Sequence, residues 1–296
     1  MTEELLKEIR NVRLIALDID GTLMDADKRF PEINCRALQA CEARGVRLAL
    51  VSGRSFELMR GFARELGIHP ILAACNGARI EAGEDGPTLC ERSFTRAEAE
   101  RVCRTLEDSG MYFNSYRRGK CYMGNPEVRP SLGPRYAHHI PGTIDDPLYP
   151  YETVCDRERL WGEGLDGVYK FVALGQEYDS GFDRLQAELS DMHLSVSSAS
   201  KRNKEFMPSG VDKGFAVRAI CRELGIPQSQ VMAFGDMTND IPMLHAAGMP
   251  VAMENGEDSV KAVSRLIAPD HNLGGVGLVL ERHLLQKPAN KKSSPK

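Results

Sequence analysis

The feature that most constrains this chain is an apolar run that ends in two carboxylates. The run from Leu14 to Leu17 leads directly into Asp18-Ile19-Asp20-Gly21-Thr22-Leu23. A short apolar run flanked by polar residues is typical of a strand that is buried on both faces of a parallel sheet. Acids directly after such a strand lie at its carboxyl end, where open α/β sheets bind ligands. The run therefore predicts an α/β sheet with a functional site at its edge.

Two other interpretations of this stretch stay open on its own residues. Calcium loops also begin Asp-x-Asp, but they require an acid or amide at the fifth position, Gly at the sixth and Glu at the twelfth. Here Gly21 comes directly after the second Asp, and the acids follow a strand pattern. An ordinary turn also uses Asp and Gly. The rest of the chain has to decide between a turn and a site.

Composition excludes several classes of protein. The 296 residues are 42% hydrophobic and 27% charged, which is the balance of a soluble globular protein. The net charge is −4 and no basic block is present, so we expect no nucleic-acid partner. No apolar stretch approaches the length of a membrane span, and the segment 1–10 mixes acidic and basic residues, unlike a signal peptide. We therefore expect no membrane partner.

The cysteines favour a reducing compartment. The chain has 8 of them, scattered and without a Cys-x-x-Cys pair, so neither zinc spacing nor a disulfide framework is indicated. Several lie inside apolar or helical patterns, as reduced buried thiols do. We expect a cytoplasmic protein that is a monomer or a weak homodimer.

Strand and helix patterns alternate at both ends of the chain. Near the N-terminus we predict strands at 46–51 and 71–74 and helices at 32–44 and 56–66. After residue 205 the alternation returns, with predicted helices at 213–224, 259–263 and 277–285 and strands at 231–234, 251–253 and 266–267. Such alternation predicts a parallel sheet with right-handed crossovers.

The middle of the chain has a different order of predicted strands and helices. A turn-rich break at 82–87 precedes Thr95-Arg96-Ala97-Glu98, a capping-box signature that opens a helix ending near Gly110. Strands are predicted at 111–117, 168–174 and 193–198, with a helix at 182–189. This order suits an antiparallel α+β unit inserted into the first domain. We therefore predict a discontinuous core at 1–82 and 206–286, an inserted domain at 83–205, and a disordered polar tail at 287–296.

Four stretches of the predicted core carry chemical groups. They are Asp18-Ile19-Asp20, Ser52-Gly53-Arg54, the approach to Lys213, and Gly235-Asp236 to Asp240. If their strands are neighbours, the acids crowd together and raise one another's pKa, which a divalent cation such as Mg²⁺ would relieve. Ser52 and Gly53 offer a hydroxyl and an N–H at a helix N-terminus, a natural anion site. Acids, Mg²⁺, an anion cradle and a lysine together indicate phosphoryl transfer.

These stretches resemble the four motifs of the haloacid dehalogenase (HAD) superfamily. Further stretches are similar to its Cof-type (subclass IIB) sugar-phosphate phosphatases; they are Asn76-Gly77-Ala78, Pro208-x-Gly210-Val211-x-Lys213-Gly214 and Val251-Ala252-Met253-x-Asn255. The resemblance spans residues 14–280. It implies a Rossmann-like core with an inserted C2B-type cap domain.

The resemblance also implies roles for single residues. Asp18 would be the nucleophile that forms an aspartyl-phosphate, and Asp20 the general acid and base, which needs a pKa above that of a free aspartate. Dehalogenases of the superfamily lack an equivalent of Asp20, so its presence argues for phosphoester chemistry. Mg²⁺ would be held by Asp18, the backbone carbonyl of Asp20 and Asp236. The remaining implied positions are the phosphate-binding Ser52, Gly53, Lys213 and Asn239, with Asp240 supporting the metal.

By the same analogy, the cap would shut out water and contact the leaving group of a small phosphorylated metabolite, plausibly a sugar phosphate. Candidate residues for this contact are Arg54, Asn76, Tyr116 and Arg117. A phosphomutase or phosphotransferase of the same fold, and a catalytically idle regulator that binds a sugar phosphate, remain alternatives. Glu254 and the loop 270–276 depart from the subfamily pattern, and 124–167 matches nothing we can quote.

Overall fold

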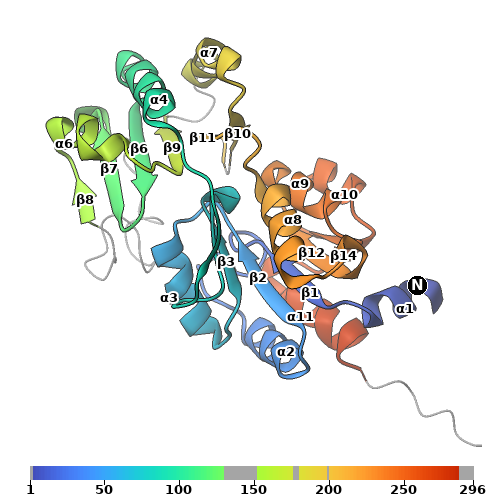
Figure 1. Cartoon of the computed structure of the whole chain (residues 1–296). Helices are drawn as coiled ribbons and strands as arrows, with labels where there is room; N and C mark the ends of the chain where they lie inside the picture. Colours follow the sequence, from blue (N-terminus) through green and yellow to red (C-terminus); the bar gives the residue numbers. More distant parts are fainter. Residues whose placement is uncertain (1–2, 130–151, 176–179, 199, 287–296) are drawn as a thin grey trace, which may run out of the picture.

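The computed structural model describes residues 3–129, 152–175, 180–198 and 200–286 (Figure 1). The larger of its two sheets has eight strands in the order β14-β13-β12-β1-β2-β3-β4-β5. Neighbours from β14 to β3 are parallel, whereas β3, β4 and β5 pair antiparallel. The strands are β1 (Leu14–Leu17), β2 (Arg47–Val51), β3 (Ile71–Ala74), β4 (Arg79–Glu81), β5 (Thr88–Glu91), β12 (Val231–Gly235), β13 (Met249–Met253) and β14 (Leu266–Ala268). We call this sheet and its helices the core.

Helices cover both faces of the core sheet, as the alternation of β1 requires. Ile15 and Leu17 pack on one face against α1 (Glu3–Arg10), α2 (Glu32–Ala43), α3 (Phe56–Leu66) and α11 (Gly275–Val279). Leu14 and Ala16 pack on the other face against α8 (Lys213–Leu224), α9 (Ile241–His245) and α10 (Asp258–Ala262). A strand that is apolar on both faces therefore lies in the middle of a doubly covered sheet, which confirms the predicted fold class.

The second sheet belongs to the inserted part of the chain, here called the cap. Its order is β10-β11-β9-β6-β7-β8, and only β7 and β8 are parallel neighbours. The strands are β6 (Tyr112–Arg117), β7 (Lys120–Gly124), β8 (Glu152–Val154), β9 (Lys170–Leu174), β10 (Ser195–Ser197) and β11 (Asn203–Met207). Two cap helices, α4 (Arg96–Asp108) and α7 (Gly181–Glu188), pack against one face, and α6 (Arg157–Trp161) lies near β7. Figure 1 shows the cap above the core.

The capping box at the start of α4 is confirmed, because Thr95 and Glu98 exchange the expected hydrogen bonds. The sequence missed β4 and β5, a hairpin whose turn is the break at 82–87. The division at residues 82 and 206 stays a prediction, although sheet pairing puts β5 in the core sheet and β11 in the cap sheet. The predicted helix at 277–285 is instead the end of α11 followed by a π-helical turn, Leu280–Leu284.

Two expectations fall wholly or partly outside the described residues. The predicted tail at 287–296 lies beyond them, as does 130–151 of the unmatched segment 124–167. All 8 cysteines are free thiols, as the sequence predicted. Among the helices of the described residues, none combines the length and the apolar character needed to cross a membrane.

Candidate active site

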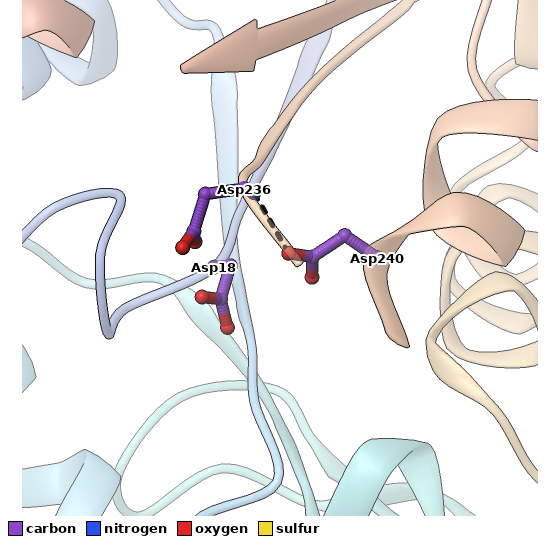
Figure 2. A group of neighbouring side chains, drawn as sticks. All are labelled: Asp18, Asp236 and Asp240. Carbon is purple, nitrogen blue, oxygen red and sulfur yellow. Dashed lines mark hydrogen bonds between the residues drawn. The ribbon is translucent and has the colours of Figure 1, made fainter. Parts of the chain in front are cut away.

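The two acidic motifs leave the core sheet side by side. β1 pairs with β12 in parallel, with Leu17 opposite Phe234, and the backbone N–H of Asp18 continues the ladder to the carbonyl of Phe234 at 3.1 Å. Asp18 and Asp236 therefore emerge at the same edge of the sheet, although their motifs are far apart in sequence. Figure 2 shows their carboxylates turned toward the same space, with Asp240 beside them.

Lys213 joins two of these carboxylates. Its Nζ lies 2.6 Å from an oxygen of Asp18 and 2.6 Å from an oxygen of Asp240. The lysine is the first residue of α8, whose N-cap Asp212 accepts a hydrogen bond from the N–H of Phe215. Its side chain is only 2% exposed, so both ion pairs lie away from solvent. The predicted meeting of the β1 end with the lysine is thus present in the structure.

Asp240 acts as a support for its neighbours. Its second oxygen accepts a hydrogen bond from the backbone N–H of Asp236 at 2.9 Å (Figure 2). The same oxygen accepts another from the backbone N–H of Met237 at 3.1 Å. Since the first oxygen is bound by Lys213, both oxygens of Asp240 are occupied. Asp236 is oriented in turn by Thr22, whose hydroxyl donates to it at 2.9 Å. The backbone after β12 is therefore held in one position.

Burial dominates the electrostatics of this cluster. It raises the pKa of Asp18 well above its usual value; Lys213 opposes this shift, whereas Asp240 and Asp236 add to it. Burial, followed by the charge of Asp240, raises the pKa of Asp236 to about 7. For Lys213, burial favours the neutral form, but Asp18 and Asp240 outweigh it and raise the pKa above its ordinary value. The single positive charge of Lys213 does not neutralise the three carboxylates of this cluster.

The donor set fits a hard divalent cation. Carboxylate oxygens of Asp18, Asp236 and Asp240 lie within 4.8 Å of one another. Both oxygens of Asp240 are already bound, so Asp18 and Asp236 are the carboxylates that could ligate the ion, with Asp240 supporting them. Oxygen ligands from one or two carboxylates are what Mg²⁺ commonly takes from a protein. Burial and neighbouring carboxylates raise the pKa values of Asp18 and Asp236, so a positive charge at this position would stabilise their ionised forms. A cation would supply it.

The carboxylate of Asp20 lies apart from that group and is held by two cations. Arg54 donates to both of its oxygens, at 2.6 and 2.7 Å, and Lys28 donates to one at 2.9 Å. Burial favours the neutral acid, but Arg54 and then Lys28 outweigh it and hold the pKa of Asp20 far below its usual range. This is opposite in direction to the raised pKa that a general acid needs. Asp20 could therefore act as a general acid only if Arg54 and Lys28 moved away from its carboxylate.

The expected phosphate-binding residues lie at the ends of core elements: Ser52 follows β2, Lys213 begins α8 and Asn239 follows β12. Ser52 is buried, and its hydroxyl accepts a hydrogen bond from the N–H of Arg54 at 3.2 Å. Asn239 has a buried side-chain oxygen without a partner among the described residues, as does Asn76. Both amides line a cavity of about 280 Å³ that also contains Lys213 and, from the cap, Ser195 and Ser197. The cavity therefore lies where core and cap residues meet, beside Lys213.

The cap candidates divide into two groups. Asn76, in the turn Cys75–Gly77, donates to Glu205 of the cap at 2.6 Å, and the ring of Tyr116 lies 5.4 Å from the ammonium of Lys170. Tyr116 also packs against the cluster that contains Cys75 and Ala78 of the core, so both candidates lie where the cap meets the core. Arg117 donates to the backbone carbonyl of Glu163 instead, a contact internal to the cap.

Sequence reasoning missed several residues that shape the site. Lys28 follows no strand, and its position near Asp20 depends on a loop whose φ at this residue is 62°. Lys170 and Glu205 could have been found, because each is a charged residue inside an apolar strand pattern.

The segments near residues 254 and 270, which depart from the subfamily pattern, are hydrogen-bonded to one another and to the motif that follows β1. Asn255 donates to the carbonyl of Gly21 at 2.8 Å and accepts from the N–H of His271 at 3.0 Å. Glu254 accepts a weaker contact from the N–H of Asp270 at 3.2 Å. The loop that departs from the subfamily pattern therefore supports the backbone of the first motif.

Comparisons with known proteins identify the family of this chain. The chain matches the haloacid dehalogenase-like hydrolase family over residues 15–280. It belongs to that family. The match covers every residue of the acidic cluster, and the prediction of a Cof-type phosphoric monoester hydrolase is confirmed.

Similar proteins have comparable lengths. The HMP-PP phosphatase of Cronobacter sakazakii is 30% identical, with 82% of this chain and 84% of that protein covered. The 5-amino-6-(5-phospho-D-ribitylamino)uracil phosphatase YcsE of Bacillus subtilis is 25% identical, with 94% and 98% covered. Among solved structures, the subclass IIB sugar phosphatase BT4131 superposes with a TM-score of 0.73 at 20% identity, covering 92% of this chain and 98% of that one. The structural likeness concerns the fold alone.

Proposed function

We propose that this family member is a Mg²⁺-dependent phosphatase that hydrolyses small phosphorylated metabolites, plausibly sugar phosphates, through an aspartyl-phosphate on Asp18. The observation that carries the proposal is the buried carboxylate of Asp18, which Lys213 contacts at 2.6 Å, with a second acid two residues further along. A protein that only binds a ligand has no use for a nucleophile paired with an acid. The same observation argues against an idle regulator.

The first half of the reaction would use both acids of the first motif. An oxygen of Asp18 attacks the phosphorus, and the bond from phosphorus to the leaving oxygen breaks. Asp20 gives its proton to that oxygen, so the leaving group departs as an alcohol. Ser52, Gly53, Lys213 and Asn239 would hold the transferring oxygens.

The second half would release the phosphate. Asp20, now a carboxylate, takes a proton from water, and the water oxygen attacks phosphorus. The bond between phosphorus and Asp18 breaks, which restores the carboxylate and frees inorganic phosphate. When bound by Asp18, Asp236 and the Asp20 carbonyl, Mg²⁺ would supply positive charge against the phosphoryl oxygens.

The ion pairs of Asp20 imply a further role for the phosphoryl group of the substrate. A phosphate group is a stronger partner for Arg54 than one carboxylate, because it offers several charged oxygens to the guanidinium. We infer that an arriving phosphoryl group draws Arg54 from Asp20, which raises the pKa of that acid as the leaving oxygen approaches. Proton donation would then be limited to the loaded site.

A metabolite panel tests the proposal. Purified protein is incubated with sugar phosphates, phosphorylated nucleotide precursors and phosphorylated acids, with Mg²⁺ and then with EDTA, and released phosphate is measured. Release from at least one small ester, abolished by EDTA, is the expected result. No release from any of them would refute the proposal. Label from ¹⁸O water in the product separates a hydrolase from a phosphomutase, whose product phosphate would carry none.

A further inference from the structure

Two charged residues lie on the face of the cap sheet that meets the core. Lys170 in β9 alternates with Phe171, and Glu205 in β11 alternates with Phe206. Both phenylalanines pack in the apolar interior of the cap. Since successive side chains of a strand point to opposite faces, the lysine and the glutamate lie on the other face of the sheet.

The two residues form a buried ion pair. Nζ of Lys170 lies 2.9 Å from an oxygen of Glu205, and the side chains are only 5% and 4% exposed. Ser197, opposite Glu205 in the sheet, donates to its other oxygen at 3.2 Å. Although burial favours its neutral form, Lys170 holds the pKa of Glu205 below its usual value, so this carboxylate is ionised. A buried pair adds little net stability compared with apolar residues of the same volume, which leaves its presence to be explained by geometry.

The pair makes two contacts with the core. Lys170 donates to the backbone carbonyl of Gly53, and Glu205 accepts from Nδ2 of Asn76 at 2.6 Å. A Cβ placed on Gly53 would lie 3.3 Å from a Glu205 oxygen, so the glutamate also packs directly over this loop. Both contacts fall on segments that follow core strands, β2 and β3.

Those two segments are themselves joined. The N–H of Asn76 donates to the carbonyl of Ser52 at 2.8 Å, and the N–H of Cys75 donates to the carbonyl of Arg54 at 2.8 Å. Asn76 has φ 57°, in the left-handed region that an asparagine adopts more easily than most residues. The pair therefore contacts one hydrogen-bonded unit, and part of that unit is the proposed phosphate loop at 52–54.

We propose that Lys170 and Glu205 are positioning residues, which fix the loop 52–54 for the transferring phosphoryl group when the cap is closed on the core. The lysine holds the peptide between Gly53 and Arg54 through its carbonyl, and the glutamate holds the adjacent turn through Asn76. Opening the cap would break both contacts and leave the ion pair intact within the cap. The phosphate loop would thus be fully ordered only in the closed molecule. The inference rests on the proposed function for the identity of the group that the loop receives.

A double variant separates positioning from stability. Lys170→Met/Glu205→Met replaces the pair by unbranched apolar side chains, so no buried charge is left without a partner. We expect thermal unfolding within a few degrees of the wild type, and a kcat with p-nitrophenyl phosphate lowered by about tenfold or more, because displacements near 1 Å can cost about 100-fold. The inhibition constant of inorganic phosphate should rise, and hydrogen exchange at 52–54 and 75–77 should become faster.

The matched control is an ion pair internal to the cap. Arg101 donates to both oxygens of Asp191, at 2.8 and 2.7 Å, and Arg101→Met/Asp191→Met should change none of these quantities. If Lys170→Met/Glu205→Met keeps wild-type kcat, phosphate inhibition and loop exchange, the proposal is wrong. If that variant does not fold, Glu205→Gln and Lys170→Arg decide by the same measurements, and wild-type values in both overturn it.

Hydrogen exchange also keeps the two proposals apart, since it requires no turnover. A wild-type protein that releases no phosphate refutes the proposed function. Faster exchange confined to the two core segments of the double variant would still support the coupling of cap and loop.

Discussion

The ammonium group of Lys213 lies 2.6 Å from a carboxylate oxygen of Asp18, although 195 positions separate the two residues. The whole cap lies between them in sequence. β1 ends in the acid and α8 begins with the lysine, so the contact exists only when the two core segments are assembled around one sheet. We therefore expect both the stability of the fold and the catalytic activity to depend on the pair of Asp18 and Lys213.

Lys213→Met should unfold more easily than the wild type and lose activity. The change leaves Asp18 and Asp240 buried beside each other without their shared cation. Removing one partner of a buried ion pair costs roughly 3–5 kcal/mol. Urea unfolding without metal measures the difference. Lys261→Met, at an exposed pair with Asp258 of 3.9 Å, is the control and should cost less than about 1 kcal/mol. Equal losses of unfolding free energy in the two variants would show that the buried pair contributes no more to stability than the exposed one.

Gly21→Ala should disturb the acidic site. Gly21 has φ 75°, and a Cβ there would lie 2.3 Å from an oxygen of Asp236, which must then move. Gly45 has φ 82° but nothing within 4 Å of such a Cβ, so Gly45→Ala isolates the backbone cost of about 1–2 kcal/mol. We expect Gly45→Ala to keep full activity and Gly21→Ala to lose at least about tenfold in kcat, because the displaced carboxylate is a proposed ligand of Mg²⁺. Initial rates under saturating substrate measure this, and equal activity in the two variants would contradict it.

Strand ends and the chemistry of their residues were readable from the sequence because the signals are local. The run before Asp18 and the capping box at Thr95 each depend on a few neighbouring residues. The meeting of Asp18 and Asp236 followed from the rule that the carboxyl ends of parallel strands share one edge. Lys213 opens a helix, so its position did not follow from that rule.

Pairings that depend on tertiary contact were not readable. Nothing local to Lys28 predicts that its loop turns back to Asp20, and nothing local to Arg54 predicts that it holds the same carboxylate. The hairpin of β4 and β5 was missed because its residues are few and only half apolar. The direction of the pKa shift at Asp20 was missed for the same reason, since it depends on two cations that the fold brings in.

Asp18→Asn should retain the fold and lose turnover of p-nitrophenyl phosphate. The amide keeps the shape of the side chain and can still accept a hydrogen bond from Lys213, but it is not a nucleophile. We expect kcat to fall by at least about a thousandfold with little change in thermal unfolding. Asp258→Asn, on an exposed carboxylate of α10, is the control for loss of one acid. Unchanged turnover in Asp18→Asn would remove the basis of the mechanism.

Mg²⁺ should stabilise the protein more at pH 8 than at pH 5. Burial and Asp240 raise the pKa of Asp236 to about 7 in the folded chain, against 3.8 for a free aspartate. Between about pH 4 and pH 7 the folded state therefore binds more protons than the unfolded state, so the free energy of unfolding without metal falls as pH rises. Mg²⁺ competes with those protons, and the thermal shift that it produces should grow through this window and level off above it. In Asp236→Asn the metal shift should be largely lost and the decline should become smaller, since the pKa of Asp18 is also raised. A metal shift of the same size at pH 5 and pH 8 would show that protons and the cation do not compete at this carboxylate.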